Sequence, residues 1–319
     1  ACDLSRGRPS RAPLFAVLAF FAVPMYQVMG LLMTIDGPYA ACWIAAMWSA
    51  WRAVQRRSGP AWIVLGLLIG VGFLYKYTIL LLIPGLMIFV ILRHRSLALA
   101  RHAPLWITVG FSAMIACMIP VVMWNHDQGW PTVAHLLGHL GVRGGDVEVT
   151  QGGAAGWTYN PAWTLSFLGG QIGMVGPVIA VMTIAAIRTL RRPDPSEIPR
   201  EASSDTDPRT ADLFLLCGML PLLSFYFLTS FITEPEGNWT LAAYLTGCVL
   251  AGRFLDRAFP QPASFLAPAP VASTLPRTSA KWVGGLWTAS LIMGLAVMLV
   301  VPRLDLMHRI VQPVYELVA

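Results

Sequence analysis

The chain has 319 residues, of which 56% are hydrophobic and only 12% charged, and its mean hydropathy is +0.63. This composition excludes an ordinary soluble domain and indicates a membrane protein. The formal net charge is +6, but Lys and Arg are scattered singly or in pairs between apolar runs. We therefore expect the lipid bilayer, and no nucleic acid, as a partner.

Nine apolar runs follow one another along the chain, and most are long enough to cross a hydrocarbon core of about 30 Å as a helix. They cover Pro13–Met33, Pro38–Val54, Ala61–Tyr75, Thr78–Leu92, Pro104–Trp124, Trp163–Ile187, Leu213–Ile232, Leu241–Leu255 and Trp282–Val301. The sequence therefore predicts an all-α polytopic membrane protein with about nine transmembrane helices. We expect one transmembrane domain over residues 1–302 and a short external tail over 303–319.

The stretch Ala61–Leu92 is either one tilted helix or two short helices that turn at Lys76. With two helices, all but four of the 22 Lys and Arg lie on the cytoplasmic side, the exceptions being Lys76, Arg143, Arg303 and Arg309. With one helix the charge bias is lost, and Lys76 sits at the bilayer centre at a cost of about 3 kcal/mol. We therefore predict two helices, with the N-terminus inside and the C-terminus outside. Arg outnumbers Lys twenty to two, which is typical of a GC-rich bacterial genome, so we expect a bacterial inner membrane.

Asp36 lies in the short predicted external hairpin Thr34–Pro38. An Asp before Gly-Pro commonly marks the start of a helix, so Asp36 can be a capping residue. A carboxylate at the hydrocarbon boundary is also a candidate functional group. Both interpretations stay open on the sequence.

Lys76 stands between Tyr75 and Tyr77 at the turn between the two short helices. A compact cation flanked by amphipathic rings at the interface suits a lipid phosphate. The alternative is ordinary snorkelling of a lysine with aromatic anchors beside it. Nearby, Gly66 and Gly70 form a GxxxG pair, a weak signal of close helix packing.

The longest predicted external loop runs from Asn125 to about Asn160 and includes a predicted surface helix with His135 and His139. These histidines share one helix face, but no HExxH-type Glu accompanies them, so we predict an interfacial helix and no metal site. Arg143, the one arginine of this loop, can clamp a phosphate or be a solvated surface residue.

A second predicted external turn, Thr233–Trp239, carries Glu234, Glu236 and Asn238. Either carboxylate can bind a sugar or an amine. Favourable placement of negative charge at a helix start explains both as well.

Four segments, in this order, resemble motifs of the bacterial GT-C membrane glycosyltransferases related to protein O-mannosyltransferases and to the lipid A aminoarabinose transferase. Thr34–Pro38 is similar to a Thr-x-Asp-x-Pro hairpin, and Gly70–Thr78 to a Gly-x-x-x-x-x-Lys-Tyr-Thr stretch. Pro120–Pro131 resembles Pro-x-x-x-Trp-Asn-x-x-x-Gly-Trp-Pro, and Glu236–Trp239 resembles Glu-x-Asn-Trp.

The resemblance implies a GT-C-like fold that transfers a sugar from a polyprenyl-phosphate carrier to an acceptor at the external face, by inverting displacement and without a cofactor. It implies that Asp36 is a catalytic carboxylate, the second acidic residue of the cavity, and that Lys76 and Arg143 bind the donor phosphate. Further residues are expected to line the cavity or the acceptor site: Tyr75, Tyr77, Asn125, His139, Glu236 and Asn238.

The family's main acidic pair lies in the first external loop, after an additional N-terminal span, and has no counterpart in this sequence. We therefore expect a truncated sequence. Two alternatives remain open: a non-catalytic subunit that binds lipid phosphate, and a secondary transporter, which paired broken helices in repeated halves would favour.

Overall fold

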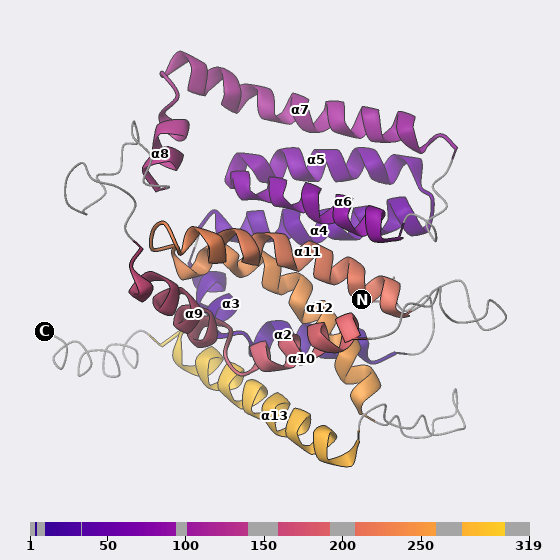
Figure 1. Ribbon diagram of the computed structural model, residues 1–319, viewed down its shortest axis with the longest axis vertical. Helices are drawn as coiled ribbons and strands as arrows, with labels where there is room; N and C mark the ends of the chain where they lie inside the picture. Colours follow the sequence, from indigo (N-terminus) through magenta and orange to yellow (C-terminus); the bar gives the residue numbers. More distant parts are fainter. Residues whose placement is uncertain are drawn as a thin grey trace, which may run out of the picture. The chain divides into compact units, whose positions relative to one another are not determined.

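The computed structural model describes residues 4, 10–32, 34–93, 101–139, 159–191, 208–259 and 276–303 (Figure 1). Every regular element in these ranges is a helix, which confirms the predicted all-α class. In chain order they are α2 (Ala12–Ala22), α3 (Pro24–Leu31), α4 (Asp36–Gln55), α5 (Gly59–Tyr75), η1 (Tyr77–Leu81), α6 (Leu82–Arg93), α7 (Ala103–Asp127), α8 (Pro131–His139), α9 (Pro161–Val175), α10 (Val178–Arg191), α11 (Pro208–Thr229), η4 (Gly237–Thr240), α12 (Leu241–Ala258) and α13 (Arg277–Val300).

Among the described residues, three helical segments are long and apolar enough to cross a membrane: Ala103–Asp127, Arg209–Thr229 and Thr278–Val300. The number rises to five if each of two bent helix pairs is a single span. The structure thus supports a multi-pass membrane protein, while the number nine and the orientation of the termini stay predictions.

The chain divides into two compact units. The first comprises Ala1–Thr34, Gln171–Leu216 and Tyr244–Ala319, and the second comprises Ile35–Gly170 and Cys217–Ala243.

In the second unit, α5 packs against both α4 and α7. The backbones of α5 and α7 approach so closely that a Cβ on Gly66 would overlap the carbonyl oxygen of Gly110, and one on Gly110 would overlap that of Trp62. A Cβ on Gly70 would lie 2.8 Å from the carbonyl oxygen of Met114. The GxxxG pair is therefore a packing surface, as small residues at membrane helix interfaces commonly are.

The predicted break at Lys76 is confirmed. Helix α5 ends at Tyr75, Lys76 is extended (φ −150°, ψ 125°), and the 3-10 helix η1 begins at Tyr77 and leads into α6. Gly72 lies close to the chain after this turn, since a Cβ there would overlap the side chain of Ile79.

Two predicted single spans are wrong as straight helices. Within Pro13–Met33 the chain bends by 71° between α2 and α3, where Val23 is extended and Pro24 cannot donate a helical hydrogen bond. Within Trp163–Ile187 it bends by 105° between α9 and α10, where Gly176 has φ +71° and precedes Pro177. Both bends lie in the first unit, in which α13 packs against α2, α3 and α10.

A buried ion cluster holds another part of the first unit together. Asp212 on α11 is fully buried and accepts hydrogen bonds from Arg253 Nε and Arg257 Nη2 of α12, each at 2.7 Å. Asp256 accepts a hydrogen bond from Ser10 Oγ at 2.7 Å, which adds the segment before α2. Pairing of this kind offsets the cost of burying the carboxylate.

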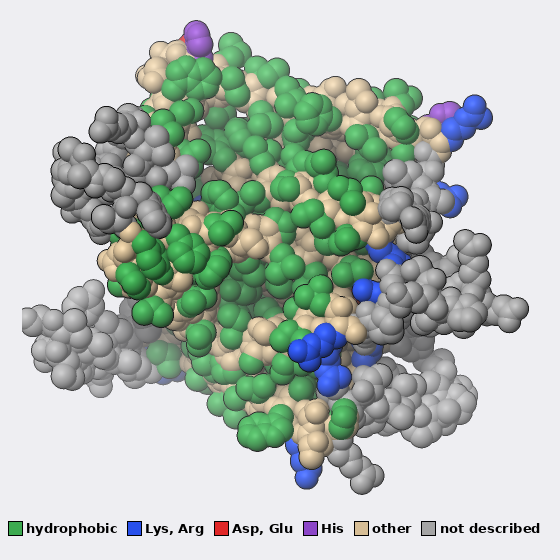
Figure 2. All heavy atoms as spheres, viewed as in Figure 1, with side chains coloured by type: hydrophobic (Ala, Val, Ile, Leu, Met, Phe, Trp, Pro, Cys, Tyr) green, Lys and Arg blue, Asp and Glu red, His purple; other side chains and the backbone are tan. Residues whose placement is uncertain are grey.

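Helix α7 has the surface of a lipid-facing helix. Leu105, Phe111 and Met123 are each more than half exposed. Figure 2 shows this face covered by hydrophobic side chains, with Lys and Arg at the end where α7 begins. An apolar surface of this extent indicates contact with hydrocarbon.

Candidate functional site

Asp36 is the first residue of α4, and its side chain is almost fully buried. The N-cap of α4 is Ile35, which makes no side-chain cap, and the Asp36 carboxylate turns to Lys76 instead, with 2.5 Å between Oδ1 and Nζ. The capping interpretation is therefore wrong in its geometry, although negative charge in a first helical turn is still favourable.

Lys76 reaches Asp36 from the turn between α5 and η1. Its side chain is 16% exposed and that of Asp36 11%, so water touches the pair without solvating it fully. The ammonium also lies 5.8 Å from the ring centroid of Tyr39, within the range of a cation–π contact. The turn thus presents a cation in a partly desolvated, aromatic setting.

A third segment, η4, completes the site. Asn238 Nδ2 lies 3.5 Å from Asp36 Oδ2, at the outer limit of a hydrogen bond. The neighbouring Trp239 packs its ring 5.2 Å from that of Tyr226 on α11. The structure therefore brings together three of the predicted residues, Asp36, Lys76 and Asn238, from segments far apart in the sequence.

The predicted cavity residues Tyr75, Tyr77 and Glu236 flank these segments. Tyr77 donates a hydrogen bond to Thr132 Oγ1 at 3.2 Å, which links the Lys76 turn to the start of α8. Tyr75 ends α5 and is 39% exposed, and Glu236 precedes η4 with an exposed side chain. Their role as acceptor or cavity residues remains a prediction.

Asn125 is buried and shapes the link between α7 and α8. Its Oδ1 accepts a hydrogen bond from the Thr132 backbone N–H at 3.1 Å, and its carbonyl oxygen accepts one from Trp130 N–H at 2.6 Å. The second contact holds Trp130 at φ +64°, an unfavourable backbone conformation for a bulky residue. Asn125 thus supplies a partner for an otherwise unbonded N–H at the start of α8.

The remaining predicted residues are less fully described. His139 ends α8, which confirms the predicted helix but not its side of the membrane, and nothing is described of its side chain. Arg143 lies outside the described residues. In the part of the chain that the structure describes, no group of three or more His, Cys, Asp and Glu side chains is placed to hold a metal ion.

The sequence interpretation assigned no role at the site to three residues, Tyr39, Thr78 and Tyr226. The Tyr39 hydroxyl lies 3.0 Å from Thr78 Oγ1, and Tyr39 itself is 2% exposed. The side chain of Tyr226 also interacts with Thr78. Thr78 lies inside the Lys-Tyr-Thr motif and could have been found there, whereas nothing in the sequence marks Tyr39.

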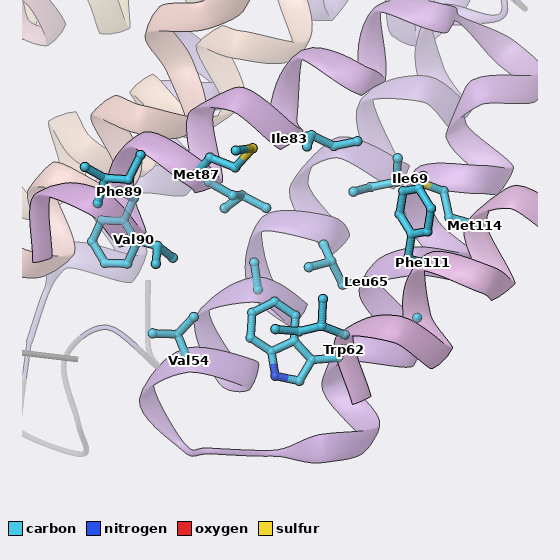
Figure 3. Close-up of a pocket in the computed structure, with 16 residues that line it drawn as sticks. Val54, Trp62, Leu65, Ile69, Ile83, Met87, Phe89, Val90, Phe111 and Met114 are labelled. Carbon is cyan, nitrogen blue, oxygen red and sulfur yellow. The ribbon is translucent and has the colours of Figure 1, made fainter. Parts of the chain in front are cut away.

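An apolar cavity of about 360 Å³ lies among α4, α5, α6 and α7 (Figure 3). Its lining includes Trp62 and Ile69 from α5, Ile83 and Met87 from α6, and Phe111 from α7. Ile69 precedes Lys76 by seven residues on α5, or about 10 Å at 1.5 Å per residue. The same helices thus carry a charged pair at one end and an apolar cavity further along.

Comparison with known proteins gives two matches. Residues 6–124 match the family of dolichyl-phosphate-mannose-protein mannosyltransferases, a region that includes Asp36, Lys76 and Thr78. The chain is 27% identical over 199 residues to lipid A galacturonosyltransferase RgtD of Rhizobium johnstonii, covering 62% of this chain and 36% of that protein. The chain thus spans about a third of its curated relative, and no solved structure matches it.

Both matches are to sugar transferases, and the family match covers the motifs around Asp36 and Lys76. Over the matched regions the chain is thus similar to membrane glycosyltransferases of GT-C type.

Proposed function

We propose that this protein transfers a sugar from a polyprenyl-phosphate-linked donor to a lipid acceptor at the external face of the inner membrane. The observation that carries the proposal is the contact between Asp36 and Lys76, which places a cation and a carboxylate together in a partly desolvated site. A cation there can stabilise the charge of a leaving phosphate, which is the largest electrostatic change in such a reaction.

In the proposed reaction, the donor phosphate replaces Asp36 as the partner of Lys76. The acceptor hydroxyl oxygen attacks the anomeric carbon, a new C–O bond forms, and the bond from that carbon to the phosphate oxygen breaks with inversion. Polyprenyl phosphate leaves with the electron pair, held by Lys76. The released Asp36 carboxylate takes the proton of the acceptor hydroxyl as general base.

The cavity shown in Figure 3 supports a lipid-linked donor. Its lining is apolar, and α5 and α6 connect it to the Lys76 turn. A polyprenyl chain attached to a phosphate at Lys76 is long enough to extend along these helices into it. Burial of such a chain is favourable by about 0.8 kcal/mol per methylene.

The relative's name suggests the first substrates to test. RgtD is a lipid A galacturonosyltransferase, so we propose a lipid A-type glycolipid as acceptor and galacturonate as the first sugar to try. The purified protein in proteoliposomes would be given polyprenyl-phosphate galacturonate and lipid A, with the products analysed by mass spectrometry.

Lipid A carrying one added hexuronate is the expected product, and Lys76→Ala should abolish its formation. Failure with every sugar tried, while the protein still binds undecaprenyl phosphate through Lys76, would instead identify a non-catalytic lipid-phosphate-binding subunit.

A further inference from the structure

A second layer of contacts lies beside the charged pair. Thr78 Oγ1 is 3.0 Å from the Tyr39 hydroxyl, and Tyr226 interacts with Thr78 as well. Tyr39 and Tyr226 are 2% and 5% exposed, so these hydroxyl contacts are shielded from bulk water. A buried hydroxyl that loses its partner keeps its desolvation cost, which makes such contacts strong local constraints.

This layer ties together the same three segments that carry the proposed site. Tyr39 follows Asp36 by three residues on α4, so the two side chains lie on neighbouring positions of one helix face. Thr78 follows Lys76 by two residues in the turn. The start of α4 and the turn are therefore joined twice, once by the ion pair and once by the hydroxyls.

The third segment joins through the rings. Trp239 of η4 packs against Tyr226, at 5.2 Å between ring centroids, and Tyr226 interacts with Thr78. Thr78 thus interacts with a tyrosine of α4 and with a tyrosine of α11.

We infer that Thr78, held by Tyr39, is a positioning residue that keeps the Lys76 ammonium aimed at the donor phosphate once that phosphate has displaced Asp36. The inference rests on the proposed function. A phosphate at Lys76 breaks the ion pair, which leaves a four-carbon side chain on an extended backbone with one fewer constraint. The hydroxyl contact involves neither charged group, so it persists and the site stays preorganised.

The test separates the effect of the Thr78 hydroxyl from the effect of the rest of the side chain. Thr78→Val removes the hydroxyl at nearly constant volume, and Thr78→Ser keeps it. Tyr39→Phe removes the partner hydroxyl but retains the ring beside Lys76. The dissociation constant of undecaprenyl phosphate would be measured by titration for each purified variant in nanodiscs, with undecaprenol, which lacks the phosphate, as control ligand.

We expect Thr78→Val and Tyr39→Phe each to weaken undecaprenyl phosphate binding about three- to tenfold, the effect of one hydrogen bond. Thr78→Ser should bind as the unmodified protein does, and undecaprenol binding should not change. Combined with Lys76→Ala, Thr78→Val should have no further effect, because the hydroxyl acts through Lys76.

The inference would be overturned if Thr78→Val lowered the affinity for undecaprenyl phosphate equally with Lys76 present and with Lys76→Ala. It would also be overturned if Thr78→Val lowered the affinity for undecaprenol by the same factor. Either result would show a merely structural role. Unchanged binding in both Thr78→Val and Tyr39→Phe would also overturn it. If Lys76→Ala itself binds undecaprenyl phosphate normally, the proposed function fails first, and that outcome is distinct from the others.

Discussion

Asp36 and Lys76 are forty residues apart in the sequence, yet their charged atoms lie 2.5 Å apart in the fold. One stands at the start of α4 and the other in the turn after α5. In the proposed reaction, the carboxylate occupies the position beside Lys76 that a donor phosphate would take. Binding of a donor and release of Asp36 then become the same event.

Asn238 is expected to tune this exchange. Its amide lies 3.5 Å from the Asp36 carboxylate, so Asn238→Asp places a second negative charge beside the first and opposite the incoming phosphate. Repulsion between like charges at this range should weaken undecaprenyl phosphate binding by about tenfold or more, and Asn238→Ala should weaken it less.

The matched control is Asn160→Asp, the same change at an amide that accepts a hydrogen bond from Ala162 N–H at the start of α9. Equal affinity losses in Asn160→Asp and Asn238→Asp would show that the added charge acts from any position, against the proposed contact.

Asn125 is expected to stabilise the start of α8 and not to contact the donor. Asn125→Ala removes the acceptor of the Thr132 N–H and should destabilise the start of α8 by about 1 kcal/mol. Hydrogen exchange of the Pro131–His139 amides should accelerate, while Asn125→Asp, which keeps an acceptor oxygen, should restore protection. Unaltered exchange together with lost donor binding would instead assign Asn125 to the cavity.

The apolar cavity gives a prediction about chain length. Met87 lines it and is exposed on its outer side, so Met87→Trp should fill part of the space. Affinity for undecaprenyl phosphate should fall several-fold, and affinity for farnesyl phosphate, whose chain is short, should not. Met298→Trp on α13 is the control, because Met298 is also exposed but lies outside this cavity. Equal losses for both phosphates would argue against a tail in the cavity.

The predicted topology is testable by cysteine labelling. In a protein whose native cysteines are replaced, Gln128→Cys should react with a membrane-impermeant maleimide added to intact inner-membrane spheroplasts. Arg56→Cys should react only after the membrane is opened. Both positions are exposed in the structure. The reverse pattern would place the Lys76 turn on the cytoplasmic side.

The helical class could be predicted because the length of each apolar run is read directly from the sequence. The break at Lys76 could be predicted because a lysine within an apolar run is costly at the bilayer centre. The bends after Val23 and Gly176 were missed because hydropathy stays high across them. Their only signals were Pro24 and Pro177, which restrict the backbone without changing its polarity.

The site was predictable in part. Polar residues in otherwise apolar surroundings were recognisable as candidates, namely Asp36, Lys76 and Asn238. The order of the motifs that contain them placed all three in one predicted site. Tyr39 could not be found this way, since what distinguishes it is its long-range contacts with Thr78 and Lys76. Long-range hydroxyl pairs of this kind depend on how the helices pack, which no local pattern records.

The most direct measurement of the central claim is the affinity of undecaprenyl phosphate for three purified proteins: the unmodified chain, Lys76→Ala and Asp36→Asn. Because Lys76→Ala loses a charge-assisted contact, its affinity for undecaprenyl phosphate should fall by about ten- to a hundredfold. Asp36→Asn should bind as tightly as the unmodified chain or more tightly, because the competing carboxylate has gone. Weaker binding by Asp36→Asn, or unchanged binding by Lys76→Ala, would contradict the exchange of carboxylate for phosphate at Lys76.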